Sequence, residues 1–182
     1  MQEISLNILD IAQNSVKAGA SLVRITVDEQ PTTDRLTVCI EDDGCGMTAE
    51  QVARVTDPFF TSRTTRKVGL GVPFLKMAAE MTDGSFAIHS VPGEGTTVTA
   101  VFGLSHIDRM PLGDIAETVG ALIQCNPQMD VVYCHRRGTR SFTTDTREFR
   151  AVLGEDIPLS TPEVAVYIRS WLTEGEASLD EA

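Results

Sequence analysis

The chain has 182 residues and a formal net charge of −11, with 42% hydrophobic and 23% charged residues. These values are typical of one main globular domain with room for a small appendage. So acidic a chain is poorly suited to non-specific binding of nucleic acid or of an anionic membrane, and no apolar run is long enough to cross a bilayer. The four cysteines have neither CxxC spacing nor a compact disulfide pattern, which predicts reduced thiols in a cytoplasmic protein.

Hydrophobic periodicity predicts one helix and two strands at the start of the chain, over 3–18, 22–28 and 36–40. On this helix Asp10, Asn14 and Lys17 recur at spacings of four and three residues. They therefore share one face and can converge on a single ligand. The alternative is an ordinary solvated stripe on an amphipathic helix.

The second strand runs directly into an acidic, glycine-rich turn, Glu41-Asp42-Asp43-Gly44. An acid at the end of a strand, followed by Gly-x-Gly, is well placed to present one carboxylate to the edge of a base. Thr48 then caps a short helix, with Gln51 at the capping-box position.

Residues 58–79 contain no Asp or Glu, although the chain as a whole is strongly acidic; they carry the cations Arg63, Arg66, Lys67 and Lys76. Guanidinium and ammonium groups neutralise phosphate, and this distribution therefore favours a nucleotide site. Residues 57–68 have no clean period, which predicts a mobile loop. A helix is predicted over 70–81, which would put the amides of Gly69 and Gly71 at a helix N-terminus, where anions bind readily.

The rest of the chain predicts two strands and then a mixed C-terminal part. The strands cover 85–91 and 96–102, joined by a Pro-Gly-Glu-Gly turn. The elements that follow are a helix over 112–124, a hairpin over 129–144, and helices over 146–153 and 162–173, the last with Thr161 as its cap. We expect the acidic tail, 174–182, to be frayed. The Cys134-His135 pair is interpreted as packing, not as a metal site.

Five motifs follow one another in the first part of the chain: DIAQNSVKAGA, DDGCGM, DPFFTSR, KVGLG and GEGTT. This ordered set strongly resembles the GHKL superfamily of ATP-binding domains, which includes gyrase, the heat-shock chaperone, histidine kinases and the DNA-mismatch-repair ATPases. The resemblance covers about residues 3–103. It implies an α+β fold: a Bergerat-type α/β sandwich over 1–104, with a mixed sheet and helices on one face. Residues 105–182 would form a small α+β extension of unknown role.

The resemblance also implies roles for individual residues. Asn14 would hold the Mg²⁺ that bridges the phosphates, and Asp42 would accept a hydrogen bond from the adenine amino group, with Thr96 beside it. Asp10 is the catalytic candidate, because it stands where several relatives have a Glu that activates water. The other residues implied to bind ATP are Lys17, Gly44, Gly46, Met47, Phe59, Thr61, Arg63, Lys67, Val68, Gly69, Leu70, Gly71 and Val72.

The function implied by the resemblance is Mg-ATP binding, with slow hydrolysis or an ATP-gated conformational switch. We expect a protein partner and no nucleic acid or membrane, with a homodimer as a further option. One alternative is a protein kinase that phosphorylates a partner or His106, since SHIDRMPL around His106 looks like a phosphoacceptor box. Against this, the acid is two residues away and the box follows the ATP domain, so a turn between strand and helix is the preferred interpretation. A third hypothesis is a regulatory module that holds nucleotide without turnover.

Overall fold

The computed structural model of the protein describes residues 3–57, 71–154 and 157–180. Within these residues the elements are α1 (Ile4–Lys17), β1 (Leu22–Gln30), β2 (Arg35–Asp42), α2 (Ala49–Val55), α3 (Gly71–Glu80), β3 (Ser85–Val91), β4 (Gly95–Gly103), α4 (Ile115–Cys125), β5 (Asp130–Arg137), β6 (Arg140–Asp145), α5 (Thr146–Leu153) and α6 (Pro162–Ser178). None of these helices has the length and apolar character needed to traverse a bilayer.

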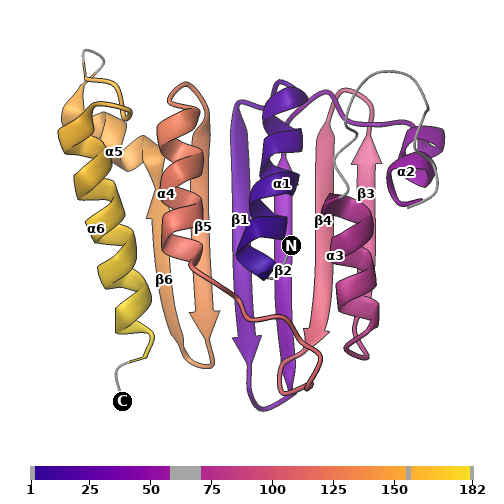
Figure 1. The fold of residues 1–182 in the computed structure, drawn as a ribbon. Helices are drawn as coiled ribbons and strands as arrows, with labels where there is room; N and C mark the ends of the chain where they lie inside the picture. The colour runs from indigo at the N-terminus through magenta and orange to yellow at the C-terminus, as the bar shows by residue number, and fades with distance from the viewer. Residues whose placement is uncertain (1–2, 58–70, 155–156, 181–182) are drawn as a thin grey trace.

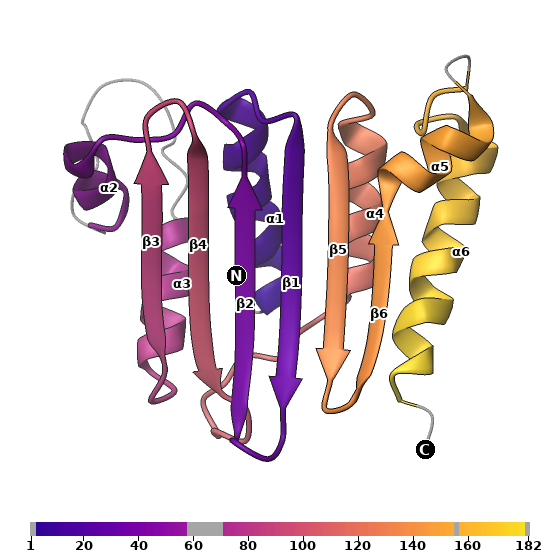
Figure 2. The same cartoon turned by 180° about the vertical axis from the view of Figure 1, so that it is seen from behind.

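The strands form one mixed sheet in the order β3-β4-β2-β1-β5-β6. Strands β1 and β5 are parallel, and every other neighbouring pair is antiparallel. Helices α1, α3, α4 and α6 cover one face of the sheet, and the described residues place no helix across the other (Figures 1 and 2). The predicted α+β sandwich, with a mixed sheet and helices on one face, is confirmed.

The hydrophobic core lies between the sheet and this helical layer. Alternate residues of β1, among them Val23 and Ile25, point into it and are fully buried, as is Ile8 of α1. The same core cluster includes Val131 of β5 and Leu172 of α6. The N-terminal part and the C-terminal extension therefore share one sheet and one core, and the division at residues 104/105 stays a prediction.

Local signals predicted several boundaries well and failed at others. The capping box of Thr48 and Gln51 is present at α2. Helix α4 begins three residues later than expected, because Asp114 accepts the N–H of Glu117 as its cap. The preceding carbonyls of Pro111 and Leu112 instead accept backbone N–H groups at the start of α1. Thr161 takes the N-cap position of α6, but its hydroxyl accepts no capping hydrogen bond.

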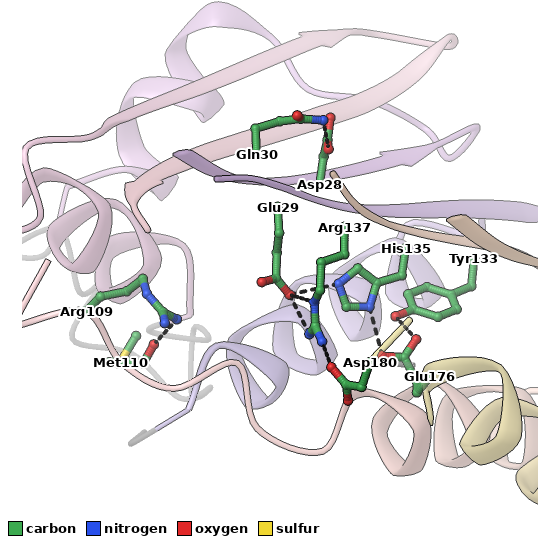
Figure 3. A network of polar contacts seen from close by, with 10 residues as sticks. All are labelled: Asp28, Glu29, Gln30, Arg109, Met110, Tyr133, His135, Arg137, Glu176 and Asp180. Atoms are coloured by element: carbon green, nitrogen blue, oxygen red, sulfur yellow. Dashed lines mark hydrogen bonds and ion pairs between the residues drawn. The ribbon is translucent and has the colours of Figure 1, made fainter. Parts of the chain in front are cut away.

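The expectation of a frayed tail is wrong. Helix α6 continues to Ser178, and Leu179 just beyond it is buried. Glu176 of this helix accepts hydrogen bonds from the Tyr133 hydroxyl at 2.7 Å and from Nδ1 of His135 at 2.8 Å (Figure 3). The acidic character of the tail suggested solvent exposure, but one of its carboxylates serves as the partner of groups on β5.

Candidate nucleotide-binding site

A cavity of about 150 Å³ lies between the second half of α1, one end of β2 and β4, and the start of α3. Its walls are mainly aliphatic and come from α1, β2, α3, β3 and β4, which contribute Ile11, Ile40, Val72, Ile88 and Val98. The polar side chains that interrupt these walls are Asn14, Ser15, Asp42 and Thr96, together with the thiol of Cys45. An apolar cavity with a few convergent polar groups is the usual form of a small-molecule site.

Asp42 closes one end of this cavity, and its carboxylate is held from two sides. Oδ1 accepts the backbone N–H of Gly44 at 2.9 Å, and Oδ2 accepts the hydroxyl of Ser15 at 2.6 Å. An ionised carboxylate has about four acceptor positions, so two remain for a ligand. Because the two bonds fix its orientation, the carboxylate needs little rearrangement to accept an N–H group of a bound base.

Thr96 faces Asp42 across the β2–β4 ladder. Its hydroxyl lies 2.8 Å from that of Ser90, which also donates to the carbonyl of Gly95 at 2.9 Å. Ser90 in turn accepts the backbone N–H of Met47 at 2.8 Å. Ser90 of β3 therefore connects the backbone of Met47 with the hydroxyl of Thr96.

The turn after β2 requires glycine at the position of Gly46. Gly46 has φ of +64°, and a Cβ there would lie 1.9 Å from the carbonyl oxygen of Val91. Since L-residues avoid this backbone region and the obstacle is main chain, no side chain fits without displacing β3. The Gly-x-Gly spacing thus brings the turn against β3, which places Met47 at the cavity wall.

Asp43, the other acid of the turn, has a structural role. Its Oδ1 accepts the backbone N–H groups of Ser21 and Leu22 at 2.8 and 2.9 Å, and its Oδ2 accepts the Ser21 hydroxyl. Burial alone would raise the pKa of the Asp43 carboxyl, but these hydrogen bonds outweigh burial and lower the pKa. Asp43 therefore anchors the start of β1.

Helix α1 presents its polar residues along the cavity and toward α3. Asn14 lines the cavity, whereas Asp10 lies one turn earlier, against the first residue of α3. A Cβ on Gly71 would come within 1.9 Å of Oδ2 of Asp10, so any other residue there would require the Asp10 side chain to move. Lys17 is exposed at the end of the helix and does not line the cavity.

The structure thus brings together Asn14, Asp42, Gly46, Met47, Val72 and Thr96 around one cavity. Gly44 reaches the same site through its bond to Asp42, and Gly71 lies against Asp10. The remaining predicted positions lie outside the described residues: Phe59, Thr61, Arg63, Lys67, Val68, Gly69 and Leu70.

Two serines of the site were not predicted. Ser15 is buried and is hydrogen-bonded to Asp42, and Ser90 connects Met47 with Thr96. The signal for Ser15 was weak: a small hydroxyl residue directly after Asn14, on the core side of the helix. Nothing distinguished Ser90 from any other alternating strand residue.

The oxygen donors of α1 are chemically suited to Mg²⁺. Within the described residues, neither the Asn14 amide nor the Asp10 carboxylate has a side-chain hydrogen-bond partner, so both remain available to a ligand. Mg²⁺ prefers hard oxygen ligands and commonly takes one or two from the protein, with the rest from phosphates and water. No group of three or more His, Cys, Asp or Glu in this part of the chain could hold a metal by itself. Asn14 and Asp10 can supply only part of a ligand set, so they fit a Mg²⁺ ion whose other ligands come from a polyphosphate and water.

The fold and the site together define a GHKL-type ATP-binding domain. Residues 1–106 match the family model described as histidine kinase-, DNA gyrase B- and HSP90-like ATPase. The match covers more than half of the chain, and the chain belongs to this family.

Curated relatives carry the same domain within much longer proteins. The chain is 36% identical over 115 residues to the "Non-motile and phage-resistance protein" of Caulobacter vibrioides, a match that covers 60% of this chain and 14% of that protein. It is 34% identical over 110 residues to the "Sensor protein kinase FleS" of Pseudomonas aeruginosa, covering 60% of this chain and 27% of that protein. The chain therefore spans only a minor part of the relatives it matches.

Among solved structures, the N-terminal domain of a DNA repair protein aligns with a TM-score of 0.51 at 10% identity, covering 80% of this chain and 52% of that one. The ATPase domain of Aquifex aeolicus MutL, complexed with ADP, aligns with a TM-score of 0.48 at 13% identity, covering 78% of this chain and 63% of that one. The first of these likenesses supports the fold.

Proposed function

We propose that the chain binds Mg-ATP in the cavity between α1, β2 and β4 and uses the nucleotide as a conformational signal to a protein partner, with at most slow hydrolysis. The observation that carries this proposal is the Asp42 carboxylate, held by Ser15 and Gly44 at the end of an aliphatic slot. Its free acceptor positions suit the exocyclic amino group of adenine. We place this activity in the cytoplasm.

The residues of α1 would act on the phosphate end of the nucleotide. Asn14 would hold Mg²⁺ through its amide oxygen, and the bound ion would neutralise charge on the phosphates. Asp10 lies one helical turn away, where its carboxylate can take a proton from a water molecule. Its side chain is one methylene shorter than Glu, and a misplacement of about 1 Å can cost roughly a hundredfold in rate. Slow turnover follows from this short reach.

Asp42→Asn tests the proposed base recognition. An amide at this position presents a donor toward the adenine amino group, so we expect ATP affinity to fall by about 1–3 kcal/mol, or roughly 5- to 150-fold. Wild-type protein should prefer ATP over GTP, because guanine carries a carbonyl at the corresponding ring position. Isothermal titration calorimetry measures both effects. Glu41→Gln is the matched control, since Glu41 is exposed on the preceding residue of β2. Unchanged ATP affinity in folded Asp42→Asn would refute the assignment.

A second candidate function is phosphoryl transfer to a partner protein. It is favoured by the sensor protein kinase of Pseudomonas aeruginosa, to which the chain is 34% identical over 110 residues. Incubation with γ-labelled ATP separates the hypotheses: free phosphate indicates hydrolysis, label on a second protein indicates kinase activity, and neither indicates a module that binds without turnover. Asp10→Asn should abolish phosphate release while preserving ATP binding. If phosphate release survives that change, Asp10 is not the catalytic base.

A further inference from the structure

Helices α5 and α6 enclose an apolar groove at the β6 edge of the sheet, away from the nucleotide cavity (Figure 1). The groove has a volume of about 440 Å³. Its floor and walls include Phe149 and Val152 of α5 and Tyr167 and Trp171 of α6. Three of these side chains are unusually open for their type: Val152 is 87% exposed, Tyr167 58% and Trp171 42%. Exposed aromatic residues that line a groove are typical of protein-binding hot spots.

The aromatic side chains of the groove are held in place. Phe149 meets Tyr167 and Trp171 edge-on, with ring centroids 6.3 and 6.5 Å apart. The indole Nε1–H of Trp171 donates to the hydroxyl of Thr144 at 2.7 Å. Because the one polar atom of Trp171 is already satisfied, its exposed ring surface is free to contact an apolar group without leaving a donor unpaired.

The groove carries two carboxylates that form no ion pair within the described residues. Glu148 and Glu163 lie along it, and within the described residues neither has an ion-pair partner closer than 4 Å. The arginines of the two helices pair elsewhere: Arg147 with Asp145, Arg150 with Asp130, and Arg169 with Glu117. The groove therefore combines an apolar floor with two available carboxylates, which is complementary to a segment that is both apolar and basic.

The dimensions of the groove indicate the form of this segment. The lining residues of α6 run from Glu163 to Trp171, a rise of about 12 Å at 1.5 Å per residue. Two turns of an α-helix have about the same length and place apolar side chains on one face at i, i+3, i+4 and i+7. A second copy of this chain fits less well, because a two-fold interface would bring the same two glutamates together on a chain of net charge −11.

We propose that the α5–α6 groove binds an amphipathic helix of a partner protein, with large aliphatic or aromatic residues on one face and Lys or Arg at its flanks. The helix sets its apolar face against Phe149, Val152 and Trp171, and its cations meet Glu148 and Glu163. This site is separate from the nucleotide cavity and does not depend on whether ATP is hydrolysed or transferred.

The test uses the full chain and a synthetic helical peptide of about 16 residues, with Leu on its apolar face and Lys at its flanks. Trp171 is the chain's only tryptophan, so its emission reports the groove directly. We expect a saturable blue shift and protection from acrylamide quenching. A matched peptide with Glu in place of Lys should bind at least tenfold more weakly at low salt, and the difference should shrink as salt is added.

Two exposed valines supply a variant and its control. Val152→Glu places a charge among the residues that line the groove and should weaken the Lys peptide at least tenfold, whereas Val166→Glu should leave affinity unchanged, since Val166 is 66% exposed but does not line the groove. The double variant Glu148→Gln, Glu163→Gln should reduce affinity several-fold at low salt. Equal affinity for the Lys and Glu peptides would overturn the proposal. So would equal losses in the two valine variants, or a concentration-dependent dimer in sedimentation that Val152→Glu abolishes.

Discussion

Two polar clusters among the described residues differ in how many of their side chains have a partner within the protein. At the nucleotide cavity, the Asp42 carboxylate uses two of its acceptor positions, and Asn14 keeps its amide available. Under α6, His135 is completely buried, and each ring nitrogen has a carboxylate partner: Glu176 at 2.8 Å and Glu29 at 3.0 Å (Figure 3).

The second cluster extends beyond these three residues to a closed network. The Tyr133 hydroxyl donates to Glu176, and Arg137 pairs with both Glu29 and Asp180. Its members come from β1, β5 and the end of α6, so the network attaches the last helix to the sheet. In this network every side chain has a partner within the protein, which stabilises the fold, whereas the side chain of Asn14 at the cavity has none among the described residues and is available to a ligand.

The largest effect on stability should come from removing one member of the network around His135. Glu176→Ala removes one carboxylate and leaves the Tyr133 hydroxyl and the His135 imidazole without their partner inside the protein. We expect a loss of about 3 kcal/mol in the free energy of unfolding, measured by urea denaturation. Glu174→Ala is the matched control, because Glu174 is exposed on the same helix, and its effect should stay within about 0.5 kcal/mol. Similar midpoints for both variants would show that the network does not stabilise α6.

The same network should make the free energy of unfolding depend on pH, with one decline at acidic pH and another at alkaline pH. Hydrogen bonds from His135 and Arg137 lower the pKa of Glu29 from 4.5 to about 2, although burial opposes the shift. Glu29 therefore stabilises the fold fully above pH 4.5, and this contribution, on the order of 3 kcal/mol, disappears as pH falls toward 2.

His135 acts in the opposite direction. Burial alone would lower its pKa, but the hydrogen bonds to Glu176 and Glu29 outweigh burial and raise it above 6.5. Its contribution is complete below pH 6.5 and disappears as pH rises through the folded-state pKa. Denaturation midpoints should therefore be highest between about pH 4.5 and pH 6.5. In His135→Gln the alkaline decline should flatten, and an unchanged decline would assign it to another group.

At the nucleotide cavity, Ser15→Ala should have a smaller effect, on ligand affinity. Without the hydroxyl, Asp42 loses one of the two bonds that orient it, and affinity for both ATP and adenosine should fall by about 1 kcal/mol, or roughly fivefold. Asn14→Ala should instead weaken Mg-ATP much more than adenosine, because in the proposed function Asn14 acts at the phosphate end. Ser5→Ala is the control, since Ser5 is buried on the same helix but does not line the cavity. Calorimetry with both ligands distinguishes the three variants, and equal losses for ATP and adenosine in Asn14→Ala would remove its phosphate role.

Local signals explain what could be predicted from the sequence. The Thr48–Gln51 capping box and the bounds of α5 depend on neighbouring residues, and both were predicted correctly. Asn14, Asp42 and Thr96 meet at one cavity, as the resemblance of the ordered motifs implied; the spacing on the first helix predicted only a shared face for Asp10, Asn14 and Lys17.

What could not be predicted depends on residues far apart in the chain. The parallel pairing of β1 with β5 joins segments about a hundred residues apart, and no local pattern encodes it. For the same reason His135 was interpreted only as packing, because its partners Glu29 and Glu176 come from distant segments. The support of Asp42 by Ser15 depends on a helix and a strand meeting in three dimensions.

His106 belongs to neither cluster, and we expect no phosphorylation there. It occupies a turn after β4, beside Ser105, which binds the Asp34 side chain at the far end of β2 from Asp42. The length of β2 separates these ends by on the order of 25 Å, too far for phosphoryl transfer within one chain. Nδ1 of His106 accepts the N–H of Asp108 at 3.1 Å, and Nε2 lies 3.8 Å from the Asp83 carboxylate, whose charge would repel an approaching phosphate. Incubation with γ-labelled ATP should therefore leave no acid-labile, alkali-stable label on the protein. Label that appears in wild type and is lost in His106→Ala would instead identify transfer between two chains, and the segment after β4 would then be a phosphoacceptor.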